Sequence, residues 1–338
     1  VYEKYLPYIN NNFDFAEMLS EMLGELNASH TGCRYYASGA TLSTAALGVF
    51  LDPSYEGDGL KIKEIIKRGP FAVKKNEVTP GSIIEKIDGT DIKAGEDYNA
   101  LLDGKAGKNI RLTIKNAKGK RFDLTIKAIS QGAQQELLYK RWVDRNRAIV
   151  DSVSHGRIAY VHVKAMNSES FRTVYSELLS EKNRTKDAVI VDERHNGGGW
   201  LHDDLCTLLS GKQYQEFVPH GKVVGKDPFN KWTKPSCVLI CEDDYSNGHG
   251  FPWVYKELGI GKLIGAPVAG TMTAVWWETL MDRSLVFGIP QVGCRDMRGT
   301  FGENTTLQPD IEVYNSPEDY ITGHDTQLIR AVEEMMKK

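Results

Sequence analysis

The sequence lacks the features that would assign it to a specialised class of protein. None of its apolar runs approaches the roughly 18–20 residues of a membrane-spanning helix, so we expect no membrane span. Charge of neither sign is in excess, because 42 Lys+Arg face 45 Asp+Glu and leave a net charge of −3. That balance argues against nucleic acid as the partner. The 32 glycines follow no period of three, which excludes collagen.

Cysteine is too scarce for a disulfide scaffold. The chain of 338 residues has five cysteines, at positions 33, 206, 237, 241 and 294. Cys237 and Cys241 flank an apolar run, but no second pair supplies the spacing of a structural zinc site. We therefore interpret them as small buried side chains of a strand, and we expect neither a metal nor a cofactor.

The remaining composition is that of an ordinary globular protein. Hydrophobic residues make up 41% and charged residues 26% of the chain, and its length predicts two or three domains. The sequence begins at Val1 instead of Met, so the lack of a signal peptide says nothing about the compartment.

The periodicity of apolar residues changes twice along the chain. Residues 1–28 predict helices, because apolar side chains recur at helical spacing from Phe15 to Leu26. Residues 39–128 instead carry short β-like runs separated by Gly, Pro and Asp, with a tight turn at Ile87-Asp88-Gly89. This predicts a small β-rich module. Its expected strands lie at 47–51, 62–66, 83–84, 110–114 and 122–126, and its helical stretch lies at 97–102.

From residue 130 onward, strands and helices are expected to alternate. A helix is predicted at 135–150. Strands follow at 158–163, 188–192, 236–241 and 261–265, and helices at 169–179, 201–209 and 253–258. Such alternation predicts a mixed α/β fold with a sheet and crossover helices. Catalytic groups in these sheets gather at the strand ends and in the loops that follow them.

The first chemically informative strand end is followed by three glycines. The apolar strand ending at Asp192 leads through Gly197-Gly198-Gly199 into a helix, which places backbone N–H groups beside a helix N-terminus. That is suited to an anion or an oxyanion. The segment lacks the lysine of a P-loop and the spacing of a dinucleotide fingerprint. A turn needed only for close packing is the alternative.

The second strand end carries a serine. Ser246 lies between an apolar strand and a helix, where a hydroxyl can project from the sheet edge as in a nucleophile elbow. The surrounding residues do not match G-x-S-x-G, so the segment does not indicate an α/β-hydrolase. The alternative is that Ser246 is an ordinary N-cap. His249 is expected to point away from Ser246, and the other histidines except His30 are interpreted as surface or structural residues.

In their order and spacing, five segments together resemble the tail-specific (carboxyl-terminal processing) serine proteases of peptidase family S41, and within them the tricorn type. These segments are 22–30 with Ser29-His30, the β-rich module with Pro80-Gly81-Ser82, Asp192–Gly199, the Ser246 loop with 258–265, and Gly302-Glu303-Asn304 with Pro309-Asp310. The resemblance implies a crotonase/ClpP-like α/β core with N-terminal helices and an inserted PDZ-like module. The corresponding domains are 1–38, 39–129 and 130–338.

The resemblance also implies a role for each matching residue. Ser246 corresponds to the nucleophile and His30 to its base. Ser29 and Glu303 belong to the polar network that orients the base. The backbone N–H groups of Gly198 and Asn247 correspond to the oxyanion hole.

Two departures from the family pattern bear on these roles. Residues 266–273 contain no lysine of the kind found in Ser–Lys processing proteases, which fits the tricorn type instead. The resemblance leads us to expect Asp at position 247, where this sequence has Asn. Because the implied oxyanion-hole donor is the backbone N–H, the different side chain should not abolish that role.

Substrate contacts are implied at two further places. Gly48 and Val49 correspond to a loop that binds a peptide carboxylate in the PDZ-like module, although a module without a ligand is equally compatible with the sequence. Glu216 corresponds to an acidic residue that favours Lys or Arg before the scissile bond. A solvated surface acid is the alternative for Glu216.

The expected substrate is a peptide or an unfolded protein segment. Tricorn-type enzymes also imply a homo-oligomer and a β-propeller ahead of this region, and a cytoplasmic location by analogy, with a periplasmic or secreted one as the alternative. Two other functions stay open. One is a catalytically inactive peptide-binding protein of the same fold, and the other is an enzyme acting on acyl thioesters.

Overall fold

The protein, described here from a computed structural model covering residues 1–39, 43–72 and 77–337, consists of two compact units. Unit 1 comprises Val1–Ser38 and Asn146–Lys338, and unit 2 comprises Gly39–Arg145. The division falls inside helix α2 (Gln131–Val153), whereas the sequence analysis places a boundary at residues 129 and 130. Among the described residues, no helix is both long enough and apolar enough to cross a membrane.

Unit 2 is the β-rich module. Its strands pair in the order β2–β3–β4–β6–β7, every pair being antiparallel, and β5 pairs with β4. Their bounds are β2 Val49–Leu51, β3 Leu60–Ile65, β4 Ile83–Ile87, β5 Thr90–Asp91, β6 Asn109–Lys115 and β7 Arg121–Lys127, with a 3-10 helix at Tyr98–Leu101. In β6 every second side chain is buried, which is the alternation that predicts a half-buried strand. The expected tight turn is present, with Gly89 at φ 89°.

A five-stranded parallel sheet forms the centre of unit 1. Its strand order is β16–β13–β12–β9–β8. The bounds are β8 Ile158–His162, β9 Ala188–Asp192, β12 Ser236–Ile240, β13 Lys262–Gly265 and β16 Ile311–Glu312. All residues of β8, β9 and β12 are buried, which explains why these strands are almost uninterrupted apolar runs in the sequence.

Helices cover this sheet and contribute to its core. They are α3 Ser168–Leu178, α5 His202–Leu209, α6 Asn247–Glu257 and α8 Thr326–Met336. Two short helices of unit 1, α4 Glu181–Arg184 and α7 Pro317–Thr322, bury no residue. Side chains of α3, α5 and α6 pack with those of the strands in one hydrophobic cluster. Helix α8 contacts β8, β9, β12 and β13. Because β9 and β12 are parallel neighbours, the loops after their carboxyl ends lie side by side.

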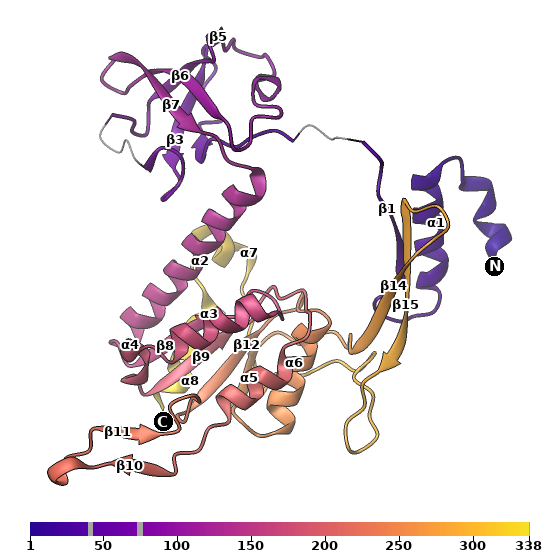
Figure 1. Cartoon of the computed structure of the whole chain (residues 1–338), viewed down its shortest axis with the longest axis vertical. Helices are drawn as coiled ribbons and strands as arrows, with labels where there is room; N and C mark the ends of the chain where they lie inside the picture. Colours follow the sequence, from indigo (N-terminus) through magenta and orange to yellow (C-terminus); the bar gives the residue numbers. More distant parts are fainter. Residues whose placement is uncertain (40–42, 73–76, 338) are drawn as a thin grey trace. The chain divides into compact units, whose positions relative to one another are not determined.

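A second sheet in unit 1 was not predicted from the sequence. It is antiparallel, in the order β1–β15–β14, with bounds β1 Gly32–Tyr35, β14 Thr273–Thr279 and β15 Leu285–Gly293. Helix α1 (Asn12–Gly24) packs along it (Figure 1), and Ala16, Cys33 and Leu285 are buried between them. Two 3-10 helices, Tyr2–Lys4 and Leu6–Tyr8, precede α1. This sheet joins the beginning of the chain to a segment about 250 residues later.

A buried ion network fixes the carboxyl end of β9. Arg194 bonds to Asp192 (Nη2 to Oδ2, 2.7 Å) and to Asp325 (Nη1 to Oδ1, 2.9 Å). Burial alone would raise the pKa of Asp192, but the guanidinium outweighs it, and the pKa of this carboxyl is lowered. Asp325 is also the N-cap of α8 and accepts from the N–H of Leu328 at 3.0 Å. The network therefore ties the end of β9 to the start of α8.

We predict that Asp325→Ala lowers the free energy of unfolding by about 2–4 kcal/mol, because it removes both a charge-assisted partner of buried Arg194 and a helix cap. Urea titration followed by circular dichroism measures the change. Glu333→Ala, at an exposed position of the same helix, is the control and should change stability by less than about 0.5 kcal/mol. Equal effects of the two substitutions would contradict this account.

Candidate active site

Ser246 occupies a strained turn between β12 and α6. Its backbone has φ 59° and ψ −120°, a conformation that residues with a side chain rarely adopt. Its N–H donates to Oγ1 of Thr271 at 2.8 Å. The side chain makes no capping hydrogen bond to α6, so the ordinary N-cap alternative is wrong. Instead its Oγ lies 2.8 Å from Nε2 of His30.

His30 is held on both sides of its ring. While Nε2 faces Ser246, Nδ1 lies 2.8 Å from Oγ of Ser29 and 3.0 Å from Oγ1 of Thr273. The backbone N–H of His30 donates to the Tyr245 hydroxyl at 2.7 Å. His30 also has a positive φ of 59°, so these contacts stabilise a conformation that its backbone alone does not favour.

A carboxylate completes this chain of polar contacts. The Ser29 hydroxyl donates to Oε2 of Glu303 at 2.9 Å, and the Ser29 backbone N–H donates to Oε1 at 2.5 Å. Oγ1 of Thr273 is 2.9 Å from the Ser29 hydroxyl. The sequence analysis did not single out Thr273, although it lies in the segment that was searched for a lysine. Its only sequence signal is its place two residues after the small residues 269–271, and that signal is not specific.

The environment of His30 favours its neutral form. Half-burial of the ring lowers its pKa below 6.5, and the negative charge of Glu303 opposes that shift only in part. A neutral imidazole can accept a proton at Nε2, so His30 can act as a base near neutral pH.

The loop after β9 packs closely against the turn that carries Ser246. Gly198 has φ 96°, and a Cβ built on it would lie 2.6 Å from Cβ of Ser246 and 2.7 Å from the Tyr245 carbonyl oxygen. Only glycine fits there without displacing the turn. The N–H of Gly198 donates to Oδ1 of Asn196 at 2.9 Å. To bind an oxyanion, the N–H of Gly198 would therefore have to share its proton between Asn196 and the oxyanion, or give up the hydrogen bond to Asn196.

Asn247, the other residue expected at the oxyanion hole, is the first residue of α6. Its backbone N–H therefore belongs to the first turn, whose amide groups have no partner within the helix. Its side-chain Oδ1 accepts from the N–H groups of Leu201 at 2.8 Å and His202 at 3.1 Å, and Nδ2 lies 2.9 Å from Nδ1 of His202. An amide can donate a hydrogen bond to that ring nitrogen and a carboxylate cannot. The contact with His202 therefore explains why Asn, and not Asp, fits at position 247.

His249 lies apart from the serine hydroxyl, as expected. Its ring is fully buried and packs edge-on against Trp253, with ring centroids 5.3 Å apart. Desolvation lowers its pKa to about 4. His249 is therefore a neutral core residue, and the base that contacts Ser246 is His30.

The structure does not bring the expected specificity residue Glu216 to this site. Glu216 lies in strand β10 (Gln215–Phe217), which forms a hairpin with β11 (Gly225–Asp227) through a 3-10 helix at Pro219–Gly221. The hairpin projects from unit 1 away from β14 and β15 (Figure 1). The Glu216 carboxylate faces Lys226 at 3.3 Å and accepts from Gln213 at 3.1 Å.

The expected carboxylate loop of unit 2 is engaged within that unit. The N–H of Gly48 donates to Oε1 of Gln134 at 3.0 Å, and Val49 is buried and paired with Ile65. Unit 2 does contain a groove of about 870 Å³. It is lined by residues 68–70, 106–107 and 124–130 together with Ala133 and Leu137, but not by Gly48 or Val49. Peptide binding by Gly48 and Val49 stays a prediction.

A second polar cluster lies at the same edge of the parallel sheet. His195 follows β9, and Cys241 and Asp243 follow β12. Each offers one atom that can bind a metal ion, and these three atoms lie within 4.8 Å of one another. The sequence analysis assigned no role to this group, because its members lie on two separate segments.

A serine on a strained turn, bonded to a histidine that is itself held by a hydroxyl and a carboxylate, is an arrangement of the serine-hydrolase class. Comparison with family models agrees with this class. Residues 157–313 match the model of peptidase family S41, and residues 55–131 match that of the tricorn protease PDZ domain. Residues 157–313 of the chain are thus a peptidase family S41 domain, and unit 2 contains a PDZ domain of the tricorn type.

Curated relatives extend this similarity to the whole chain. A tricorn protease homolog of Saccharolobus solfataricus is 27% identical over 100% of this chain and 32% of its own length. A putative tricorn-like protease C-terminal subunit of Sulfurisphaera tokodaii is 29% identical over 100% of this chain and 40% of its own length. The chain therefore spans between 32% and 40% of the length of these relatives.

A solved structure supports the fold. The crystal structure of the tricorn protease superposes with a TM-score of 0.83 at 25% identity, covering 99% of this chain and 34% of that one. The predicted mixed α/β core with N-terminal helices and an inserted PDZ-like module is confirmed by this match.

We predict that the ring of His30 titrates below pH 6.5 and that Glu303→Gln lowers its pKa further, because the substitution removes the charge that favours the imidazolium. NMR titration of the histidine ring signals measures both values. Glu278→Gln, at an exposed position of β14, is the matched control and should leave the titration unchanged. A rise of the His30 pKa on Glu303→Gln would contradict the assigned electrostatics.

Proposed function

We propose that this chain carries the catalytic site of a serine peptidase, with Ser246 as nucleophile and His30 as general base. The observation that carries the proposal is the 2.8 Å contact between Oγ of Ser246 and Nε2 of His30, on a ring whose Nδ1 is held by hydroxyl groups. The peptidase family S41 domain supports the same class of reaction.

The hydrogen-bond chain specifies the direction of proton transfer. A neutral ring that accepts at Nε2 carries its proton on Nδ1, where Ser29 can accept it. The single proton of the Ser29 hydroxyl is donated to Glu303. As Oγ of Ser246 attacks a peptide carbonyl, its proton passes to Nε2, and the imidazolium that forms is stabilised through Ser29 by the Glu303 carboxylate.

The charge that develops on the carbonyl oxygen needs donors beside Ser246. The N–H of Asn247 at the start of α6 and the N–H of Gly198 are the proposed oxyanion hole. The contact of Gly198 with the serine turn supports this assignment, because it sets the donor beside the nucleophile. The proton held by His30 then passes to the leaving amine, and water completes the hydrolysis of the acyl-enzyme.

The proposed substrates are peptides or unfolded segments of protein, cleaved internally. The names of the curated relatives, tricorn proteases, support a peptide substrate. Assembly into a homo-oligomer and a β-propeller elsewhere in the protein stay predictions. The competing function is a peptide-binding protein without turnover, which the PDZ domain by itself would also allow.

We predict that a fluorophosphonate probe labels Ser246 and that Ser246→Ala abolishes labelling. Peptide hydrolysis should fall by about 10³–10⁶-fold in Ser246→Ala and in His30→Ala, and hardly further in the double variant, because the two residues act as a unit. Peptide mapping by mass spectrometry locates the label. Ser210→Ala, at an exposed serine after α5, is the control.

The inactive alternative and the proposal give opposite outcomes in this experiment. A folded protein that binds peptide but takes no label, and hydrolyses none, would establish the peptide-binding alternative. A label on another serine that survives in Ser246→Ala would place the active site elsewhere.

We predict that kcat/KM for peptide hydrolysis rises with pH as His30 loses its proton, and reaches half of its plateau below pH 6.5. The direction follows because only the neutral ring accepts the serine proton, and the half-point is low because burial lowers the pKa of His30. Initial rates between pH 4 and 9, corrected for stability, measure the profile. A half-point well above pH 6.5 would point to a base other than His30.

A further inference from the structure

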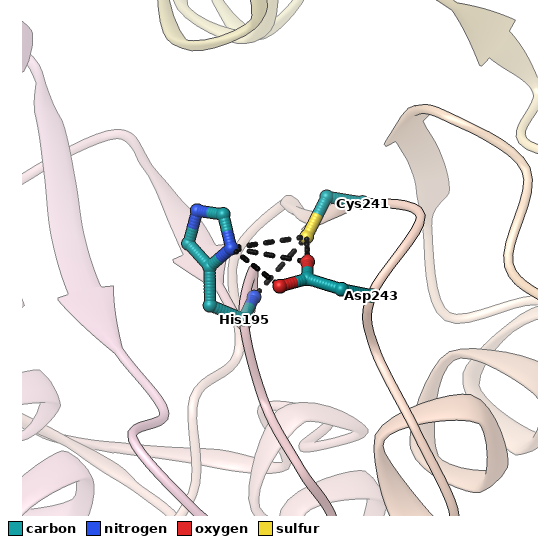
Figure 2. A group of neighbouring side chains, drawn as sticks. All are labelled: His195, Cys241 and Asp243. Atoms are coloured by element: carbon teal, nitrogen blue, oxygen red, sulfur yellow. Dashed lines mark hydrogen bonds and ion pairs between the residues drawn. The ribbon is translucent and has the colours of Figure 1, made fainter. Parts of the chain in front are cut away.

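His195, Cys241 and Asp243 lie together on the loops that follow two neighbouring strands of the parallel sheet (Figure 2). Nδ1 of His195 is 3.0 Å from Oδ1 of Asp243 and 3.8 Å from Sγ of Cys241. Sγ of Cys241 is 2.8 Å from the same carboxylate oxygen. We propose that these three side chains form a binding site for a zinc-class transition-metal ion, and that the ion links the two loops.

The separations are close to those of a tetrahedral site. Bonds of about 2.3 Å to sulfur and about 2.0–2.1 Å to nitrogen and oxygen place the ligand atoms about 3.3–3.6 Å apart. The sulfur-to-nitrogen distance needs only a small contraction. The carboxylate oxygen must move outward by less than 1 Å, which is feasible because the Asp243 side chain is 65% exposed.

The sulfur, nitrogen and oxygen ligand atoms indicate which metal ions can bind. Thiolate and imidazole ligands favour zinc and its neighbours in the first transition series, whereas magnesium and calcium favour sites made of oxygen alone. Three protein ligands leave a fourth position for water. The exposure of His195 and Asp243 leaves the cluster open to solvent, so an ion can reach it although Cys241 is buried.

Surrounding groups already hold the ligands. The backbone N–H of His195 donates to Sγ of Cys241 at 3.1 Å, a contact that stabilises a coordinated thiolate. Buried Asp244 accepts from the N–H of Cys241 at 2.8 Å and from the N–H of Asn196 at 3.1 Å, which fixes both loops relative to each other. His195 has a positive φ of 68°, and this strained backbone directs its ring toward the other loop.

The proposed metal site lies on the two loops that lead to the candidate active site. The loop with His195 continues to Gly198, and the loop with Cys241 and Asp243 continues to Ser246. An ion bound here would hold together the two loops that lead to Gly198 and Ser246. When it binds, the Cys241 thiol loses its proton to solvent and the sulfur coordinates as thiolate. The ion takes no part in peptide hydrolysis in this proposal.

Titration of the metal-free 338-residue chain with Co²⁺ tests the proposal without any activity measurement. We expect one equivalent to bind, with a thiolate-to-cobalt charge-transfer band in the near ultraviolet and the visible bands of four-coordinate cobalt. Zn²⁺ should displace the cobalt and raise the melting temperature. Cys241→Ser should abolish the charge-transfer band, and His195→Gln and Asp243→Asn should each weaken binding at least about tenfold.

Two variants serve as matched controls. Cys294→Ser removes a partly exposed cysteine elsewhere, and His324→Gln removes an exposed histidine, so both should bind cobalt like the unmodified chain. Because Cys241 is buried and its replacement can impair folding, the substitutions at exposed His195 and Asp243 are decisive. The absence of a charge-transfer band in the unmodified chain, or an unchanged cobalt affinity in both of these variants, would overturn the proposal.

Discussion

The hydrogen bond between His30 and Ser246 is the contact on which the candidate site depends. It joins residues 216 positions apart, at the ends of two different sheets of unit 1. The parallel sheet presents Ser246 at the carboxyl end of β12, and the antiparallel sheet holds His30 just before β1. Thr273 is the first residue of β14, and its hydroxyl lies 3.0 Å from Nδ1 of His30. The serine–histidine contact therefore joins segments that belong to two separate sheets.

Two strained backbone conformations meet at the candidate site. His30 and Ser246 both have φ 59°, and Gly198 packs so tightly against the serine turn that no Cβ fits. Such conformations persist only where surrounding contacts over-determine them. Here those contacts are the Tyr245 hydroxyl, which accepts from the N–H of His30, and the Thr271 hydroxyl, which accepts from the N–H of Ser246.

The elements that were predicted well are those with an unambiguous pattern. Strands β8, β9 and β12 are apolar runs because both faces are covered, and β6 alternates because one face is. The antiparallel sheet was not predicted, although β14 contains the apolar run 274–277 and β15 begins with three apolar residues. Most of their side chains are half-buried or exposed, so neither strand shows the pattern of a buried one. Helix α8 was also missed, although it is strongly amphipathic.

The sequence by itself determined the local geometry of the catalytic loops. One apolar strand is followed by Ser246 and a helix, and another is followed by three glycines. Because the carboxyl ends of parallel strands lie at one edge of a sheet, these two patterns place a hydroxyl and backbone N–H donors at that edge. Only the tertiary structure decided which side chains meet there. Thr273 joins His30, Glu216 lies on a hairpin directed elsewhere, and His195 meets Cys241 and Asp243. Periodicity reports which face of an element is buried, but contacts between distant segments depend on how the elements pack, and no local pattern encodes that packing.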